Sequence, residues 1–458
     1  MVAPSPDQQH ALDTIEAWIQ RRGPHRDHVL GGPAGTGKTT VLREVLNQAD
    51  DGKTPITLTA STNKAASVLS ATTGREATTV HSALGIRHQE DAATGRESFR
   101  QVGPCAVPED SLLVIDEASM INRDLMTLIG AEADRRGCGC LFVGDPYQLP
   151  PVGEPSCPVF ADVANQSILT TVHRQGDGNP LIDVATEYRQ VLDGEPFPPE
   201  FRDVTSEAGG CRAADTTEWL GNLLDAFDAA PFNDNPDRCR ALAWTNRRVN
   251  DLNRLIRRRV VGADDDERFV AGEMVAAGSP ITKRAQVSID GEMTWIDEVV
   301  LPTDRGATVT QTRRDIDDYG VRGWRLDLGE TVRNIFVPDN WADAKRVLSD
   351  LSTKARRLTE DAKGSGDKQL DRMRRDAWRE FFTAKKHFAD IRYPYASTVH
   401  KSQGSTYDIA FIDVGDIGRN RKRHEVARLS YVSLTRPVSW AVTCGQLPER
   451  VKKGGVTA

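Results

Sequence analysis

The chain has 458 residues, of which 38% are hydrophobic and 27% charged, and a formal net charge of −7. This length and balance predict a globular protein of about three domains and exclude a largely disordered chain. The apolar runs are too short to cross a bilayer, the N-terminal residues do not resemble a signal peptide, and seven scattered cysteines disfavour a disulfide framework or a zinc site. We therefore expect a cytoplasmic protein without a membrane partner. The negative charge leaves nucleic acid open as a partner, because a local basic groove suffices to hold phosphates.

The first motif is glycine-rich and lies near the N-terminus. Residues 29–40 read VLGGPAGTGKTT, which places GxxxxGKT after an apolar strand and before a helical pattern. In this context the backbone N–H groups of the loop surround phosphate oxygens at the positive end of the helix. Lys38 would reach the β- and γ-phosphates of ATP, and the Thr39 hydroxyl would ligate Mg²⁺. The expected nucleotide-binding residues of this loop are Gly32, Pro33, Ala34, Gly35, Thr36, Gly37, Lys38, Thr39 and Thr40.

Two further buried strands are predicted to end at the same site. Residues 112–115 are apolar and lead to Asp116 and Glu117, where Asp116 would hold Mg²⁺ through water and Glu117 would deprotonate the attacking water. Residues 140–144 lead to a proline-rich loop in which Gln148 would touch the γ-phosphate. Alone, the acidic pair would be a solvated strand end and the loop a plain turn. Beside the glycine-rich loop, they predict a nucleotide hydrolase.

The motifs resemble, in this order, those of superfamily 1B DNA helicases, in the Dda-like group of the RecD and Dda branch. The resemblance rests on GPAGTGKTT (32–40), VIDEASM (114–120) and GDPYQLPPV (144–152), and continues through TASTNKAA (59–66), TVHS (79–82), LTTVHRQ (169–175), PLIDVAT (180–186), AWTNRRVNDLN (243–253), ASTVHKSQG (396–404) and YVSLTR (431–436). The match is weakest over residues 271–374. The resemblance implies an α/β protein of two RecA-like domains with parallel sheets, which hydrolyses ATP to move along DNA.

The same resemblance assigns roles at the nucleotide. Gln8, with Gln9 as its neighbour, would read the adenine, and Gln403 and Gly404 would lie near the γ-phosphate. Arg174 and Arg436 would reach that phosphate from the second domain, where a guanidinium stabilises transition-state charge when the cleft closes. For His173, stacking on adenine and packing on the loop are both open.

Single-stranded DNA would lie across both domains. The residues that the resemblance places on its phosphates are Thr62, Asn63, Lys64, Thr79, His81, Thr398, His400 and Lys401. Contacts of this kind position the strand without reading bases, so we expect binding to be nearly sequence-blind and sensitive to salt.

Two insertions are predicted. Residues 86–102 indicate a β-hairpin, which relatives use as the pin that splits the duplex. Phe99 would stack on the last base pair or brace the pin, with a plain solvated hairpin as the alternative. Residues 271–393 contain short β-like runs, which suggest a small barrel similar to the SH3-like insertion of the Dda-like group. They also contain a charged stretch of two helices at 341–388 that breaks near 363–367. The basic clusters at 257–259, 372–375 and 419–423 are either DNA-facing or solvated helix faces.

The expected organisation is a first RecA-like domain over residues 1–178 with the pin at 86–103, a second over 179–270 plus 394–458, and an insertion domain over 271–393. The predicted function is that of an ATP-dependent, phage-type helicase moving 5′ to 3′ on single-stranded and forked DNA in replication, recombination or repair. It would work as a monomer, in the host cytoplasm if a phage encodes it, with a single-strand binding protein or replisome component as partner. The alternatives are a RecD-like subunit of a recombination complex and an ATP-gated DNA-binding remodeller that does not unwind, and RNA in place of DNA stays open.

Overall fold

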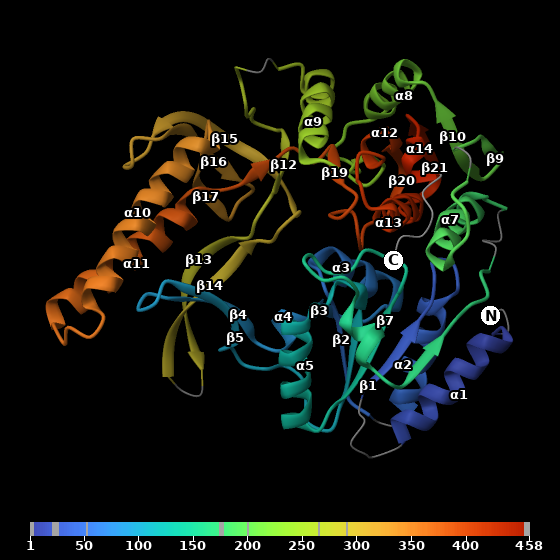
Figure 1. Ribbon diagram of the computed structural model, residues 1–458, viewed down its shortest axis with the longest axis horizontal. Helices are drawn as coiled ribbons and strands as arrows, with labels where there is room; N and C mark the ends of the chain where they lie inside the picture. The colour runs from blue at the N-terminus through green and yellow to red at the C-terminus, as the bar shows by residue number, and fades with distance from the viewer. Residues whose placement is uncertain are drawn as a thin grey trace. The chain divides into compact units, whose positions relative to one another are not determined.

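The computed structural model describes residues 4–20, 27–51, 54–173, 178–198, 201–263, 266–289 and 292–452 (Figure 1). Two compact units are present. Unit 1 comprises Met1–Gly85, Pro104–Ile256 and Tyr395–Ala458, and unit 2 comprises Ile86–Gly103 and Arg257–Pro394. The predicted domain boundaries stay predictions, although this division groups the hairpin segment with the central insertion.

The first half of unit 1 is built on a parallel sheet of strand order β3-β2-β6-β7-β1-β8. Its strands are β1 (Asp27–Gly31), β2 (Ile56–Ala60), β3 (Ala77–Thr79), β6 (Leu112–Asp116), β7 (Gly139–Gly144) and β8 (Gln166–Ile168). Its helices are α1 (Pro6–Gln20), α2 (Lys38–Asp51), α3 (Asn63–Thr73), α4 (Val80–Ala83), α5 (Arg123–Arg136) and α6 (Pro158–Asp162). The central strands are apolar runs because a parallel sheet is covered on both faces, and Leu30, Val114 and Leu141 are fully buried in its core.

The second half of unit 1 contains a sheet of order β19-β11-β20-β21-β10-β9, parallel except for the antiparallel pair β9–β10. Its strands are β9 (Val204–Ser206), β10 (Gly209–Ala214), β11 (Cys239–Ala243), β19 (Ala396–Thr398), β20 (Tyr407–Asp413) and β21 (Pro437–Cys444). Its helices are α7 (Leu181–Gln190), α8 (Thr216–Asp228), α9 (Asn246–Val261), α12 (Val414–Ile417), α13 (Arg423–Leu434) and α14 (Glu449–Lys452). The predicted α/β class with two RecA-like parallel sheets is confirmed.

Unit 2 is antiparallel wherever its described strands pair. It contains the hairpin of β4 (Ile86–Asp91) and β5 (Arg96–Gln101), a second hairpin of β13 (Ile281–Ile289) and β14 (Glu292–Leu301), and a sheet of order β17-β16-β15-β12-β18. The sheet strands are β12 (Met274–Ala277), β15 (Gly306–Ile316), β16 (Arg322–Leu328), β17 (Val332–Pro338) and β18 (Ile391–Arg392). Helices α10 (Trp341–Ala362) and α11 (Lys368–His387) run side by side and are called the helical arm below (Figure 1). An SH3-like barrel stays a prediction.

Within the basic cluster 257–259, Arg258 and Arg259 are exposed, whereas Arg257 differs from the interpretation as a DNA-facing or solvated surface. Arg257 is only 3% exposed, and its guanidinium forms two hydrogen bonds with the Glu273 carboxylate at 2.7 and 3.0 Å. A charge is buried in this way only when a partner compensates it. Arg257 therefore forms a buried ion pair within unit 2, with the residue that precedes β12.

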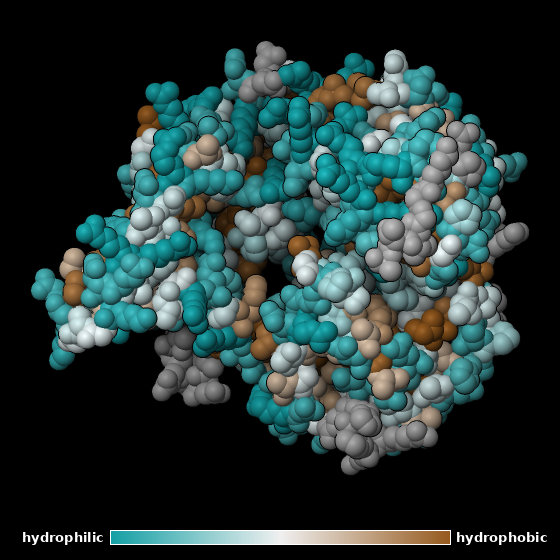
Figure 2. Space-filling model, in the orientation of Figure 1, coloured by the Kyte–Doolittle hydropathy of each residue, from teal (hydrophilic) through white to brown (hydrophobic). Residues whose placement is uncertain are grey.

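The surface seen in Figure 2 is mostly hydrophilic, and its hydrophobic residues are scattered. The most exposed large apolar side chains are Val152, Ile316 and Phe99, at 94%, 60% and 55% exposure. Among the described residues, no helix combines the length and the apolarity needed to cross a membrane.

Candidate active site

The glycine-rich loop lies between the end of β1 and the start of α2, as predicted. Gly35 and Gly37 have φ values of 80° and 83°, a backbone conformation that residues other than glycine rarely adopt. A Cβ at Gly37 would also lie only 2.3 Å from Gln8 Nε2. Lys38 Nζ donates hydrogen bonds to the carbonyls of Gly32 (2.6 Å) and Pro33 (2.9 Å), so the ammonium group lies on the loop itself. This arrangement fits a polyphosphate, with the exposed Thr39 beside Lys38 as the candidate Mg²⁺ ligand.

The acidic pair lies at the end of β6, with Asp116 as its last residue and Glu117 directly after it. Burial, together with the negative charge of Glu117, raises the pKa of Asp116 well above its usual value. A divalent cation at the site would favour the ionised carboxylate, which suits Asp116 to Mg²⁺. Glu117 adopts a left-handed backbone conformation with φ 52°, and its carbonyl accepts a hydrogen bond from the Ser61 hydroxyl at 2.8 Å. Strained backbone of this kind is common at catalytic positions and must be held by its surroundings.

The second half brings its own residues to this site. Gln403 Nε2 donates to the carbonyl of Leu149 at 3.2 Å and to Gln148 Oε1 at 3.4 Å. A Cβ at Gly404 would lie 3.8 Å from Glu117 Cγ and 3.4 Å from Thr62 Oγ1. The structure therefore places the predicted residues Gln403 and Gly404 against the predicted catalytic residues Gln148 and Glu117.

Gln8 lies under the loop instead of standing open beside it. It is 6% exposed, and its amide accepts from the Ser5 N–H and donates to the Thr36 carbonyl, both at 3.0 Å. His173 is also next to the loop, because its N–H donates to the Gly35 carbonyl at 2.9 Å. Adenine recognition by Gln8 and stacking by His173 stay predictions.

The two predicted arginines have different outcomes. Arg174 lies outside the described residues. Arg436 is 6% exposed, and its guanidinium donates to the main-chain oxygens of Val432 and Ser405, both at 3.2 Å. These partners belong to the second half, so contact between Arg436 and a γ-phosphate stays a prediction.

Two residues of α13 that had no predicted role contact the first half. Tyr431 bonds to Ala34 and Asp145, and Arg428 bonds to the loop that carries Gln148. Within YVSLTR (431–436), the resemblance assigns a role to the terminal Arg436 only. The helical spacing of three residues between Arg428 and Tyr431 was the available signal, since it puts both side chains on one face.

The predicted DNA-contacting threonines each cap a turn or helix. Thr62 Oγ1 accepts from the Ala65 N–H at 3.1 Å, Thr79 Oγ1 from the Ser82 N–H at 3.2 Å, and Thr398 Oγ1 from the Lys401 N–H at 3.3 Å. Capping explains their residue type without DNA, yet it also fixes hydroxyls at helix N-termini, where phosphates bind well. Of the others, Asn63 is exposed, whereas His81, His400 and Lys401 are partly buried. Burial lowers the pKa of His400.

Lys64 already has an anionic partner. Its ammonium group pairs with the Asp237 carboxylate of the second half, and the two side chains are 40% and 42% exposed. A carboxylate offers Lys64 the same kind of charged oxygen that a DNA phosphate would offer.

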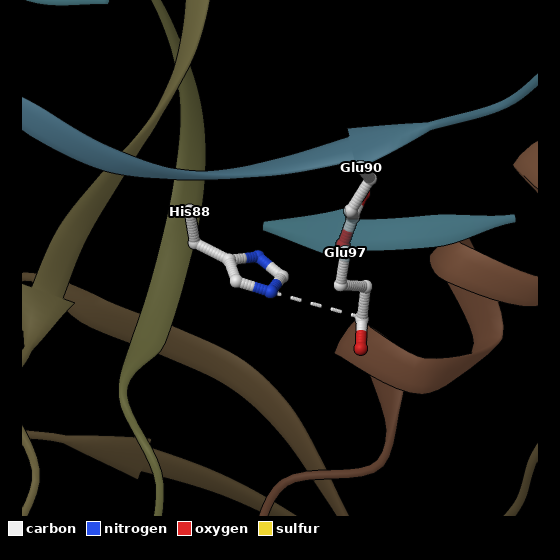
Figure 3. Close-up of side chains that lie close together, drawn as sticks. All are labelled: His88, Glu90 and Glu97. Atoms are coloured by element: carbon white, nitrogen blue, oxygen red, sulfur yellow. Dashed lines mark ion pairs between the residues drawn. The ribbon is translucent and has the colours of Figure 1, made fainter. Parts of the chain in front are cut away.

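The β4–β5 hairpin carries a polar cluster of His88, Glu90 and Glu97, shown in Figure 3. His88 Nε2 lies 3.8 Å from Glu97 Oε1. The ligand atoms of the three residues lie close enough to hold a cation, but Glu97 pairs with Lys385 at 2.6 Å and Glu90 with Lys386 at 2.7 Å. These lysines supply the positive charge that a metal would supply. Although partial burial opposes it, hydrogen bonds to Asp297 and Glu90 raise the pKa of Lys386. The cluster therefore joins the hairpin to the helical arm.

The turn of this hairpin also packs on the arm. A Cβ at Gly95 would lie 2.2–2.4 Å from ring atoms of Trp378, and Ala92 packs against the same apolar cluster. Trp378 is anchored because its indole N–H donates to Thr359 Oγ1 at 3.0 Å. Phe99 lies edge-on to His88 at 5.5 Å and is 55% exposed. The hairpin is thus braced, while its one aromatic ring stays accessible.

This chain is similar to known helicases and matches two domain families. Residues 5–194 match the family model of the AAA domain, and residues 393–442 match the UvrD-like helicase C-terminal domain. The chain is similar to the ATP-dependent DNA helicase dda of Enterobacteria phage T4, with 27% identity over 88% of this chain and 91% of the relative. It is 40% identical to the ATP-dependent RecD2 DNA helicase of Deinococcus radiodurans over 35% of this chain and 21% of the relative. Among solved structures, the Pif1 helicase from Bacteroides in complex with ADP-AlF3 and ssDNA aligns with 99% of this chain and 94% of its own, at 16% identity and a TM-score of 0.46.

Proposed function

We propose that this chain, which is an ATP-hydrolysing DNA helicase of superfamily 1B, moves 5′ to 3′ along single-stranded DNA and separates the duplex ahead of it. The predictions of family and of ATP-dependent helicase activity are confirmed. The observation that carries the proposal is that residues of the second half lie beside catalytic candidates of the first. Gln403 donates a hydrogen bond to Gln148 Oε1 at 3.4 Å, and a Cβ at Gly404 would lie 3.8 Å from Glu117 Cγ. A single nucleotide site made by both halves can couple ATP turnover to their relative motion.

Each predicted residue has a distinct task at this site. The glycine-rich loop and Lys38 hold the phosphates, and Glu117 accepts a proton from the attacking water. Thr39 and Asp116 would hold Mg²⁺, which supplies positive charge to the phosphate oxygens. Gln148 would sense the γ-phosphate, and Gln403 donates a hydrogen bond to its amide oxygen at 3.4 Å. Arg174 and Arg436 would complete the charge compensation from the second half.

An unwinding assay on tailed duplexes tests direction and activity together. We expect ATP-dependent separation of a duplex with a 5′ single-stranded tail, and none of a blunt duplex or one with a 3′ tail. Separation from the 3′ tail alone would reverse the proposed direction. ATP turnover stimulated by single strands without any separation would favour a DNA-binding remodeller instead, and the same duplexes with RNA tails test the nucleic-acid preference.

The ion pair between Lys64 and Asp237 supports a prediction about DNA affinity. If Lys64 binds a DNA phosphate, Asp237 competes for the same ammonium group. We expect Asp237→Asn to tighten single-strand binding by about two- to fivefold. This corresponds to the free energy of an exposed ion pair, about 0.5–1 kcal/mol, which DNA would no longer have to displace. Fluorescence anisotropy with a labelled oligonucleotide at fixed salt measures the change.

The control for this prediction is Asp234→Asn. Asp234 lies three positions before Asp237 and has no described ion pair, so this substitution removes the same charge without freeing Lys64. It should change affinity much less, because only general repulsion is relieved. In a Lys64→Gln background, Asp237→Asn should bring no gain. A gain that persists without Lys64 would show that the two residues do not compete through this contact.

The braced hairpin supports a role as the pin that splits the duplex, with Phe99 at the junction. Unwinding by a single polypeptide fits a monomer that loads on single-stranded or forked DNA. We further propose that it works in the cytoplasm, in phage-type replication, recombination or repair, with a single-strand binding protein or replisome component beside it. The competing role of a RecD-like subunit predicts that unwinding requires added partner chains.

A further inference from the structure

Helix α13 presents one face to the first half of unit 1. Arg428 and Tyr431 lie on this face, about one helical turn apart. Arg428 Nη1 donates to the main-chain oxygens of Pro146 at 3.2 Å and Gln148 at 2.6 Å. Helix α13 is therefore attached to the loop that positions the Gln148 side chain.

Tyr431 extends this attachment to the phosphate loop. Its side chain is 1% exposed, and its hydroxyl accepts a hydrogen bond from the Ala34 N–H at 2.8 Å and donates one to Asp145 Oδ2. Ala34 belongs to the glycine-rich loop, and Asp145 follows β7 three residues before Gln148. One phenol thus connects the phosphate loop, the Gln148 loop and the helix that precedes Arg436.

The Tyr431 hydroxyl satisfies two polar groups, the buried Asp145 carboxylate and the Ala34 N–H. Asp145 is 1% exposed, and the other described hydrogen bond to its carboxylate comes from the Tyr147 N–H at 2.9 Å. Burial and, to a smaller extent, the negative charge of Asp145 hold the pKa of Tyr431 well above its usual value. The hydroxyl therefore stays protonated and donates a hydrogen bond to the carboxylate. Loss of the hydroxyl would leave a buried carboxylate short of a donor and the Ala34 N–H without its acceptor, which is costly in a low-dielectric site.

We propose that Tyr431 is a positioning residue for ATP hydrolysis, whose hydroxyl fixes the phosphate loop and the Gln148 loop relative to the end of helix α13. This deepens the proposed function and rests on the nucleotide site being shared by the two halves. Phosphoryl transfer depends almost entirely on positioning and electrostatic stabilisation. A loosened junction should therefore reduce turnover more than it reduces the binding of ADP, because the residues proposed to hold its phosphates lie mostly in the first half.

The test compares Tyr431→Phe with the wild type and with Tyr188→Phe in steady-state ATP hydrolysis with saturating single-stranded DNA. Tyr188 is a matched control, because it is also 1% exposed and lies in the second half, while its hydroxyl has no hydrogen-bond partner among the described residues. We expect kcat of Tyr431→Phe to fall by about tenfold, as for a lost positioning contact, and its affinity for ADP to change by less than about twofold. Its affinity for ADP with aluminium fluoride, a mimic of the transferring phosphoryl group, should fall with kcat. Tyr188→Phe should match the wild type in all three.

A second variant separates positioning from stability. Asp145→Asn combined with Tyr431→Phe removes the unpaired buried charge, so the midpoint of thermal unfolding should return toward that of the wild type while kcat stays low. Recovery of kcat together with the midpoint would mean that Tyr431 acts through stability alone, and an unchanged kcat in Tyr431→Phe would also overturn the proposal. A wild-type chain that hydrolyses no ATP would instead refute the proposed function, and this inference with it.

Discussion

Replacing Glu117 by glutamine is expected to lower kcat for ATP hydrolysis by about 10²- to 10⁴-fold, the contribution of a positioned general base, while ATP binding is retained. Glutamine keeps the size of the side chain and removes its ability to accept a proton. Glu117 directly follows Asp116, and its Cγ would lie 3.8 Å from a Cβ at Gly404 of the second half. Phosphate release measures turnover, and a fluorescent ATP analogue measures binding.

The control variant for Glu117 follows from its backbone conformation. At φ 52° a non-glycine residue is strained, so Glu117→Gly should fold at least as stably as the wild type and still lose hydrolysis. If both variants lose turnover without losing thermal stability, the carboxylate is responsible and the backbone is not. Turnover of Glu117→Gln within about tenfold of the wild type would exclude Glu117 as the general base.

The nucleotide site of the first half is predictable from sequence because its signals are local. The loop before Lys38 and the strand before Asp116 each combine an apolar run with chemistry that follows at once, and a parallel sheet brings such strand ends to one edge. The structure has both strands in the same sheet, with β1 and β6 flanking β7. Local pattern alone thus places Lys38, Asp116 and Gln148 together.

Contacts between distant segments are not predictable in this way. Tyr431 bonds to Ala34 across 397 positions, and no periodicity relates the two residues. Arg257 belongs to a run of three arginines that indicates a basic helix face, but its buried partner Glu273 lies 16 positions away and is identified only by the structure. Thr62 shows a third limit, because a hydroxyl that caps a helix and one that contacts phosphate have the same sequence signature.

Gly95 also makes a contact that its sequence context does not predict, and its substitution should have a large effect on duplex unwinding. Its sequence context, AATGR, indicates a plain turn, whereas in the structure it lies directly on the Trp378 ring. We expect Gly95→Ala to slow duplex unwinding by about tenfold or more, because an overpacked contact costs about 1–3 kcal/mol, enough to favour a hairpin detached from the helical arm. ATP turnover on single strands should change by less than about twofold, since the nucleotide-site residues lie in unit 1. A stopped-flow unwinding assay, run beside phosphate release, measures both rates.

Gly320→Ala is the matched control for this prediction. Gly95 and Gly320 have φ values of 70° and 76°, so alanine strains the backbone equally at both, but a Cβ at Gly320 would meet nothing within 4 Å. Both glycines belong to unit 2, which makes general destabilisation comparable. A selective loss in Gly95→Ala would mean that strand separation needs a hairpin held rigidly enough to resist the closing duplex. Equal losses in the two variants, or normal unwinding by Gly95→Ala, would mean that the arm does not brace a working pin and that the duplex is opened elsewhere.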